Sequence, residues 1–254
     1  MYVDTEGSIQ LSFTLYRRAY GISGKVTEGG ITCTDYTTLC RRSKELDVKL
    51  PHQSRGKPLH IVVDSTGLKV YGEGEWKVRQ HGYTKRRTWR KLHLAVDESS
   101  GQIEAVVVTT NGTDDGDVLG DLLDQVGEQI KQVSADGLYD KRKCYKVIGK
   151  RNVVAAIPPR KGARIWQHGN RGKGPLARDE NLRRIRGVGR NRWKQEVGYH
   201  RRSLAETTFY RIKTIFGDRL SARGFKAQIC EMLIKCAALN RMTHVGMPDS
   251  YAVG

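Results

Sequence analysis

Residues 59–65 read Leu-His-Ile-Val-Val-Asp-Ser (LHIVVDS), a short apolar run that ends in the carboxylate of Asp64. A run of this length without polar alternation is typical of a buried strand. Two further runs, 90–97 (RKLHLAVD) and 103–110 (IEAVVVTT), flank the turn-forming residues 98–101 (ESSG). They predict a hairpin beside the first strand.

Helices and strands alternate after this hairpin. The pattern predicts, in order, a helix over 118–130, a strand over 133–136, a basic helix over 140–151, a strand over 153–159, a long helix from Trp193 and a helix over 222–243. The first three strands can pair antiparallel, and the later ones cross over through helices. The sequence therefore favours an α/β fold with a mixed sheet and flanking helices.

The pattern divides the 254 residues into three parts. Residues 1–58 form an N-terminal segment, of which residues 1–32 show no sustained period. Residues 59–245 carry the α/β pattern and include a stretch rich in glycine and arginine at 160–192, which we expect to be an exposed loop. Residues 246–254 form a tail.

Positive charge dominates the composition, with 45 Lys and Arg against 27 Asp and Glu and a net charge of +18. Residues 160–202 hold 14 bases and 3 acids, and residues 77–91 hold seven bases and no acid, with Trp76, Tyr83 and Trp89 interleaved. One such run is ordinarily a solvated face. Two runs flanking one predicted sheet favour a groove that follows nucleic-acid phosphates. The aromatic rings can stack on unpaired bases there, although a place in the core explains at least one of the tryptophans equally well.

The composition also argues against several classes of protein. No apolar run approaches the roughly 18 residues of a membrane span, and the first eight residues carry Asp4 and Glu6 where a signal peptide is cationic. The five cysteines include no C-x-x-C pair, which disfavours a disulfide framework and a zinc ribbon. We expect a cytoplasmic, nucleoid-associated protein with no membrane partner.

Three acidic residues stand out by context. Asp64 ends the first predicted strand, Asp136 ends the fourth, and Glu206 lies midway along the helix predicted from Trp193. Strand ends present functional groups in α/β sheets, so the two aspartates can converge on one site. Turn formation explains them equally well by position alone, because turn-forming residues follow both.

The long helix predicted from Trp193 has one polar stripe. At about 100° per residue, its four members lie within roughly 60° of one another. The stripe consists of Tyr199, Arg202, Glu206 and Lys213, and the opposite side of Trp193, Val197, Leu204, Ile212 and Ile215. Such a helix packs one side on the core and presents the other to a ligand.

Two aspartates and a glutamate beside a polyanion groove suit metal-dependent chemistry. Hard cations such as Mg²⁺ or Mn²⁺ prefer carboxylate oxygens, and two ions about 3.5 to 4 Å apart activate water and stabilise the leaving oxygen of a phosphodiester. Acid/base hydrolysis by a carboxylate pair is the weaker alternative, because it gives no reason for the charge of +18.

Extended motifs resemble the DDE-type transposases of the insertion sequence five family, within the insertion sequence four/five superfamily. The resemblance covers about residues 34–253 and includes a Tyr-x2-Arg-x3-Glu-x6-Lys signature. The matching motifs are His60-Ile-Val-Val-Asp64-Ser-Thr-Gly67, Gly72-Glu-Gly-Glu-Trp76, His81-Gly82, Lys85-Arg86-Arg87-Thr88-Trp89-Arg90-Lys91, Ala135-Asp136-Gly137, Ile157-Pro158-Pro159-Arg160-Lys161, and Tyr199, Arg202, Glu206 and Lys213.

The resemblance implies a ribonuclease-H-like catalytic core with a metal-binding triad of Asp64, Asp136 and Glu206, holding two Mg²⁺ or Mn²⁺ ions. The implied DNA contacts are Tyr199, Arg202, Lys213, Lys85, Arg86, Arg87, Arg90, Lys91, Arg160 and Lys161. The implied reaction is cleavage at the ends of an insertion sequence by activated water, followed by attack of the freed 3′-hydroxyl on target DNA, in a homo-oligomer bound to double-stranded DNA.

One departure from the family concerns residues 1–32, which do not resemble its helical N-terminal region. The sequence therefore predicts a copy with a shortened N-terminus. The chief alternative is a catalytically impaired DNA-binding remnant that regulates a related element. An RNA-binding structural protein explains the charge but not the three acids.

Overall fold

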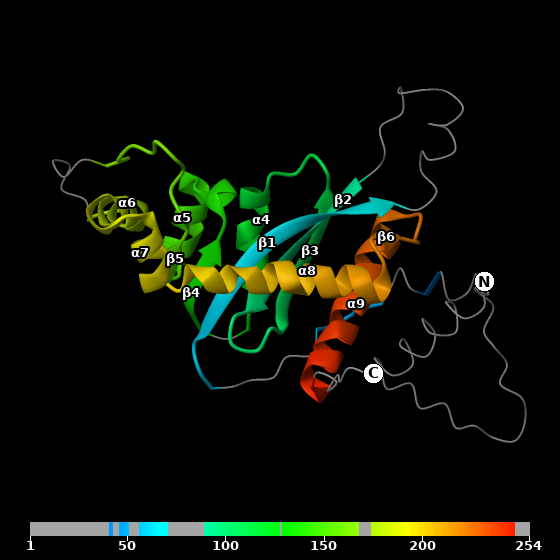
Figure 1. The fold of residues 1–254 in the computed structure, drawn as a ribbon. Helices are drawn as coiled ribbons and strands as arrows, with labels where there is room; N and C mark the ends of the chain where they lie inside the picture. Colours follow the sequence, from blue (N-terminus) through cyan, green and yellow to red (C-terminus); the bar gives the residue numbers. More distant parts are fainter. Residues whose placement is uncertain are drawn as a thin grey trace, which may run out of the picture. The chain divides into compact units, whose positions relative to one another are not determined.

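The computed structural model describes residues 41–42, 46–50, 56–70, 89–127, 129–167 and 174–246 (Figure 1). The chain forms two compact units, Met1–Pro51 with Leu220–Gly254, and His52–Arg219. The predicted boundaries at residues 58 and 245 stay predictions. Across the described ranges, none of the helices combines the length and apolar character needed to cross a membrane.

The larger unit is built on a mixed sheet. Its strands are β1 (Leu59–Val70), β2 (Trp89–Asp97), β3 (Ile103–Thr110), β4 (Ile130–Ala135) and β5 (Val154–Ala156). They lie in the order β3-β2-β1-β4-β5, with β1, β2 and β3 antiparallel and β1, β4 and β5 parallel. The predicted α/β fold with a mixed sheet is confirmed.

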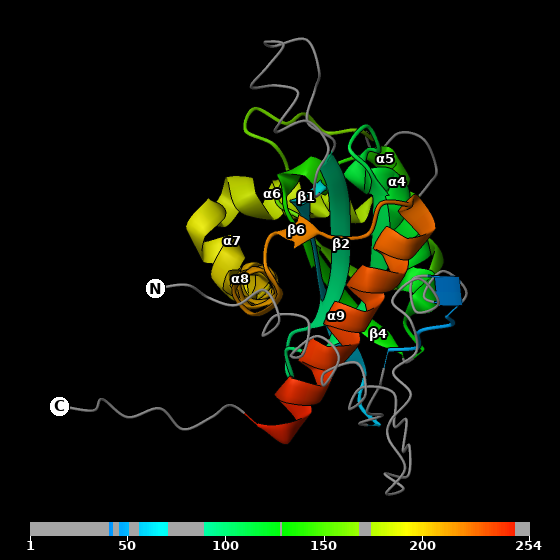
Figure 2. The same cartoon turned by 90° about the vertical axis from the view of Figure 1, so that its right-hand side faces the viewer.

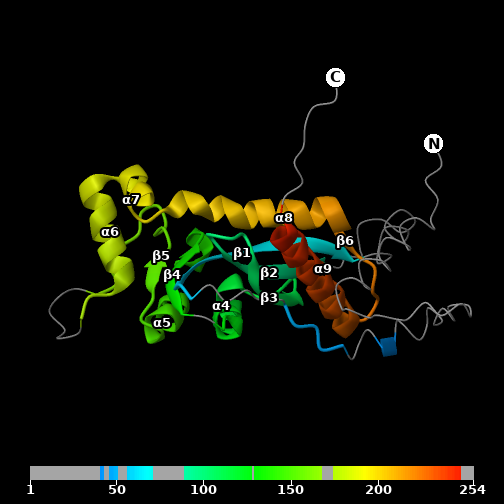
Figure 3. The same cartoon turned by 90° about the horizontal axis from the view of Figure 1, so that it is seen from below.

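Helices flank both faces of this sheet. They are α4 (Asp115–Gln125), the 3₁₀ turn η1 (Gly137–Tyr139), α5 (Arg142–Lys150), α6 (Ala177–Val188), α7 (Arg190–Glu196), the 3₁₀ turn η3 (Tyr199–Arg202) and α8 (Ser203–Phe216). The helices α4 and α5 lie on one face and α8 on the other (Figures 2 and 3). The strand β6 (Arg219–Leu220) spans the boundary between the units in sequence, and α9 (Phe225–Val245) belongs to the smaller unit.

Alternation along β1 explains which residues face each layer. Ile61 and Val63 are fully buried in one apolar cluster with Leu119 and Leu122 of α4. Successive side chains of a strand point to opposite faces, so Asp64 points toward α8. The strand β1 thus contributes apolar side chains to the core on one face and Asp64 to the candidate site on the other.

The predicted end of the first strand at Ser65 is wrong. β1 continues to Val70, and its antiparallel pairing with β2 extends to Lys69 opposite Trp89. Asp64 therefore lies inside a strand, whereas Asp136, predicted to be the last residue of the fourth strand, lies one residue beyond β4. The polar residues after Asp64 resembled a turn, but the backbone hydrogen bonds of β2 keep them extended.

The predicted unbroken helix from Trp193 is also wrong. α7 ends at Glu196, and Gly198 adopts a left-handed conformation with φ of 65° before η3 begins. Glycine adopts this conformation without a side-chain clash, so it allows the chain to turn between the two helices. Ile215, predicted on the core side, is 45% exposed.

The stretch at 160–192 is not wholly an exposed loop, because α6 and the start of α7 lie within it. Arg178 on α6 is 3% exposed. Its guanidinium donates hydrogen bonds to the buried carboxylates of Asp140 and Asp179. Arg178, one of the 14 bases counted at 160–202, therefore does not face solvent.

The remaining boundaries shift by a few residues. The helix predicted over 118–130 ends at Gln125, and Ile130 instead begins β4. The strand predicted over 153–159 has only the three residues of β5.

Candidate active site

The parallel pair β1 and β4 brings Asp64 and Asp136 to the same region. Val63 lies opposite Ala135 in the register, and each is followed by one of the aspartates. Asp64 accepts a hydrogen bond from the Ser65 N–H at 2.9 Å. Asp136 caps η1 by accepting from the Leu138 N–H at 2.8 Å.

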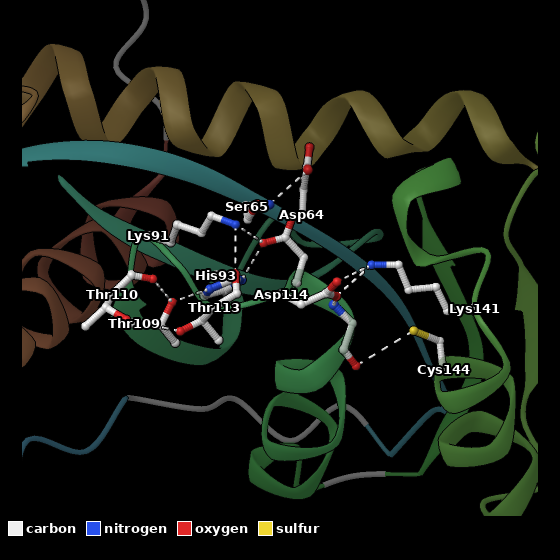
Figure 4. Close-up of polar contacts among 12 residues, drawn as sticks. Asp64, Ser65, Lys91, His93, Thr109, Thr110, Thr113, Asp114, Lys141 and Cys144 are labelled. Atoms are coloured by element: carbon white, nitrogen blue, oxygen red, sulfur yellow. Dashed lines mark hydrogen bonds and ion pairs between the residues drawn. The ribbon is translucent and has the colours of Figure 1, made fainter.

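Arg202 joins Asp64 to Glu206. Its Nη1 donates to Asp64 Oδ2 at 3.0 Å, and its Nη2 donates to Glu206 Oε1. Arg202 ends η3 and Glu206 lies in the first turn of α8, so the helix start places both over β1. Figure 4 shows the Asp64 side chain directed toward α8.

The pKa of Asp64 responds to its burial and to the charged groups around it. Burial raises the pKa of Asp64, and the negative charges of Asp136 and Glu206 raise it further. The Ser65 N–H and Arg202 oppose this rise.

Tyr199 and Lys213 flank this carboxylate group. Tyr199 lies in η3, its ring 6.1 Å from that of Trp193, and burial raises its pKa. Lys213 Nζ, two turns beyond Glu206, donates to Thr66 Oγ1 on β1 at 2.7 Å. All four residues of the predicted stripe therefore lie along η3 and α8, although they do not belong to one helix.

Hydrogen bonds hold the turn that carries Arg202. Gln132 Nε2 donates to the Val197 carbonyl at 2.8 Å, and His60 Nε2 lies 2.8 Å from Ser134 Oγ. Arg201 is paired with Glu98 from the β2–β3 turn. The contacts of Gln132 and Glu98 hold the segment 197–201 against β4 and the β2–β3 turn, and the His60–Ser134 contact joins β1 to β4. The sequence carried no periodic signal for these contacts.

Lys91 faces the other side of the sheet. Its ammonium donates to the Thr113 carbonyl at 2.9 Å and to Asp115 Oδ1 at 3.1 Å (Figure 4). The buried His93 lies 3.7 Å from the same Asp115 oxygen, and burial lowers the pKa of His93. Lys91, predicted to contact DNA, is thus engaged with α4 on the face opposite Asp64. Sequence spacing did not reveal the cluster of Lys91, His93 and Asp115.

The other predicted DNA contacts fall into two sets. Arg160 and Lys161 are exposed in the loop after β5, and Arg90 is half-buried on β2. Lys85, Arg86 and Arg87 lie outside the described residues.

The donor chemistry at Asp64, Asp136 and Glu206 suits a divalent cation. In the described part of the chain, no three Asp, Glu, His or Cys side chains are placed closely enough to hold a metal ion. Arg202 forms ion pairs with both Asp64 and Glu206. Carboxylate oxygens are the ligands that hard divalent cations prefer, so the residue types fit such an ion.

Two comparisons with family models bear on this site. A model described as a transposase DDE domain matches residues 55–241, and a second model with the same description matches residues 3–73. The second match includes residues 1–32 in large part, so the predicted shortening of the N-terminus is not confirmed. No solved structure matches the chain.

Proposed function

We propose that this chain, which belongs to the transposase DDE domain family, cleaves DNA at the ends of an insertion sequence and joins the freed 3′-hydroxyl to target DNA. The mixed sheet with its flanking helices is that of a ribonuclease-H-like core. The observation that carries the proposal is the meeting of Asp64 with Glu206 on Arg202, with Asp136 at the end of the neighbouring parallel strand β4.

Asp64, Asp136 and Glu206 would hold divalent cations. Two bound Mg²⁺ or Mn²⁺ ions supply an activated water and stabilise the charge that develops on the leaving oxygen. The chain's part is to fix the oxygen donors: a strand holds Asp64, a capped turn holds Asp136 and a helix holds Glu206.

The cationic residues around the triad would hold the DNA. Lys213 and Arg202 carry charge suited to phosphates, and the Tyr199 ring offers a surface for a sugar or base. We propose double-stranded DNA as the partner, a homo-oligomer in the DNA complex and a location at the nucleoid. The insertion sequence five family is proposed on the signature residues alone.

Strand cleavage tests the proposal. A labelled duplex that carries an element end is incubated with the chain in Mg²⁺, in Ca²⁺ and in EDTA, and nicks are mapped by gel electrophoresis. Mg²⁺-dependent nicks at the element boundary support the proposal, and binding without any nick contradicts it.

Arg202 competes with metal ions for the carboxylates, so Arg202→Gln should tighten Mn²⁺ binding. A unit positive charge a few ångströms from a divalent cation repels it by about a kcal/mol or more. We expect roughly tenfold lower Mn²⁺ dissociation constants by calorimetry.

The matched control is Arg201→Gln, which removes the same charge one residue earlier, where it pairs with Glu98. It should change the Mn²⁺ dissociation constant by less than about twofold. Equal tightening in both variants would show a general charge effect and contradict the role given to Arg202.

A further inference from the structure

A pocket of about 440 Å³ lies beside the loop that follows Asp136. Its walls include Asp140, Lys141, Arg160, Lys161, Trp166 and Arg178. Arg160 Nε lies 3.5 Å from the Gly137 carbonyl, one residue after Asp136. The pocket thus adjoins the candidate active site within the same unit of the chain.

Buried ion pairs make the pocket wall rigid. The side chains of Arg178 and Asp140 are 3% and 2% exposed, and Arg178 Nε donates to Asp140 Oδ1 at 2.8 Å. Asp140 Oδ2 also accepts from the Arg160 N–H at 3.0 Å. Asp179 accepts from the Trp166 N–H at 2.9 Å. Both ends of the loop at 160–166 are therefore fixed before any ligand arrives.

Two cations of this pocket are not neutralised by the contacts that the structure shows. Lys141 pairs with Asp114, and Arg178 pairs with Asp140. Arg160 and Lys161 are exposed and, within the described ranges, neither forms an ion pair. A rigid pocket with two surplus positive charges favours an anion.

The Trp166 ring, the aromatic part of the pocket wall, is already covered by an arginine side chain. The Arg178 guanidinium lies 3.8 Å from the centre of the Trp166 ring, and that of Arg142 lies 5.0 Å from it. A base stacked on this indole would have to displace a buried, doubly paired arginine. The pocket therefore suits a phosphate group better than a base.

We propose that this pocket binds one backbone phosphate of the DNA strand that runs past Asp136. The inference rests on the proposed function, because DNA is the substrate of that site. Arg160 and Lys161 contact the phosphate oxygens, and the Arg178–Asp140 pair holds the loop in place. Inorganic phosphate shares the chemistry and is separated from DNA by the test.

Single-position methylphosphonate substitution tests the inference. Each phosphate near the element end is replaced in turn by an uncharged methylphosphonate, and binding is measured in EDTA at one stated salt concentration. For the native chain, one position should weaken binding about tenfold. For the Arg160→Gln/Lys161→Gln variant, the same substitution should have no further effect, because the phosphate has already lost its partners.

The matched control is Lys131→Gln/Lys150→Gln, which removes two exposed charges from the far ends of β4 and α5. It should retain the tenfold response at the same position. If every methylphosphonate weakens binding equally in both double variants, the pocket makes no specific contact and the inference is overturned.

Two further outcomes separate the possible failures. The assay needs no cleavage, so a chain that binds DNA but does not cut it fails the proposed function while the phosphate position remains readable. If inorganic phosphate raises the melting temperature of the native chain but not of Arg160→Gln/Lys161→Gln, while DNA shows no sensitive position, the pocket binds free phosphate and the DNA assignment is overturned. A native chain that does not bind duplex overturns both.

Discussion

Glu206→Gln is expected to lower Mg²⁺-dependent DNA cleavage on the order of a thousandfold while changing the dissociation constant for the same DNA by less than about twofold. The substitution removes a negative metal ligand and keeps the size of the side chain. Glu206 contacts Arg202, and the substitution leaves the positive charge of Arg202 in place, so the DNA contacts should persist. Single-turnover cleavage and binding in EDTA measure the two effects separately.

Glu196→Gln is the control for this result. It removes the same charge from an exposed glutamate of α7 that pairs with Arg184 and Arg192. Cleavage by this variant should stay within about threefold of the native rate. Parallel losses of cleavage and binding in Glu206→Gln would indicate a structural role for Glu206 and contradict its place in the triad.

Arg178→Met is expected to lower the free energy of unfolding by about 3 to 5 kcal/mol. The arginine is buried between Asp140 and Asp179, and its removal leaves two buried carboxylates without their cation. Urea unfolding of the native and variant chains at neutral pH measures the difference.

Arg183→Met on the same helix provides the comparison. Arg183 is 45% exposed and pairs with the exposed Glu180, so its loss should cost less than about 1 kcal/mol. Similar losses for both arginines would show that the buried ion pairs contribute little, and the rigidity given to the loop at 160–166 would be wrong.

The sheet could be predicted because local patterns determine it. The apolar runs at 59–65, 90–97 and 103–110 became β1, β2 and β3, and the turn between the last two is short. Short apolar runs bounded by turn-forming residues are typical of buried strands, so the pattern alone indicates a strand. The end of β1 could not be predicted, because the hydrogen bonds that extend it come from β2.

Sequence spacing could group some residues of the candidate site but could not predict their contacts. Spacing placed Arg202 and Glu206 on one side of a helix, and the structure joins them across the start of α8 instead. Contacts between residues far apart in sequence, such as Arg202 with Asp64 and Lys91 with Asp115, depend on the folded sheet. Charge counts likewise cannot separate a buried arginine such as Arg178 from an exposed one.

The central claim is that Asp64, Asp136 and Glu206 share one metal site, and iron-directed cleavage of the polypeptide tests it most directly. Fe²⁺ replaces Mg²⁺ at hard oxygen ligands and, with ascorbate and peroxide, cuts the backbone nearest to it. The account predicts cuts near residues 64, 136 and 206 that excess Mg²⁺ suppresses and that Asp136→Asn removes together. Cuts at other segments, or loss of the cut near 136 alone, would contradict a shared site.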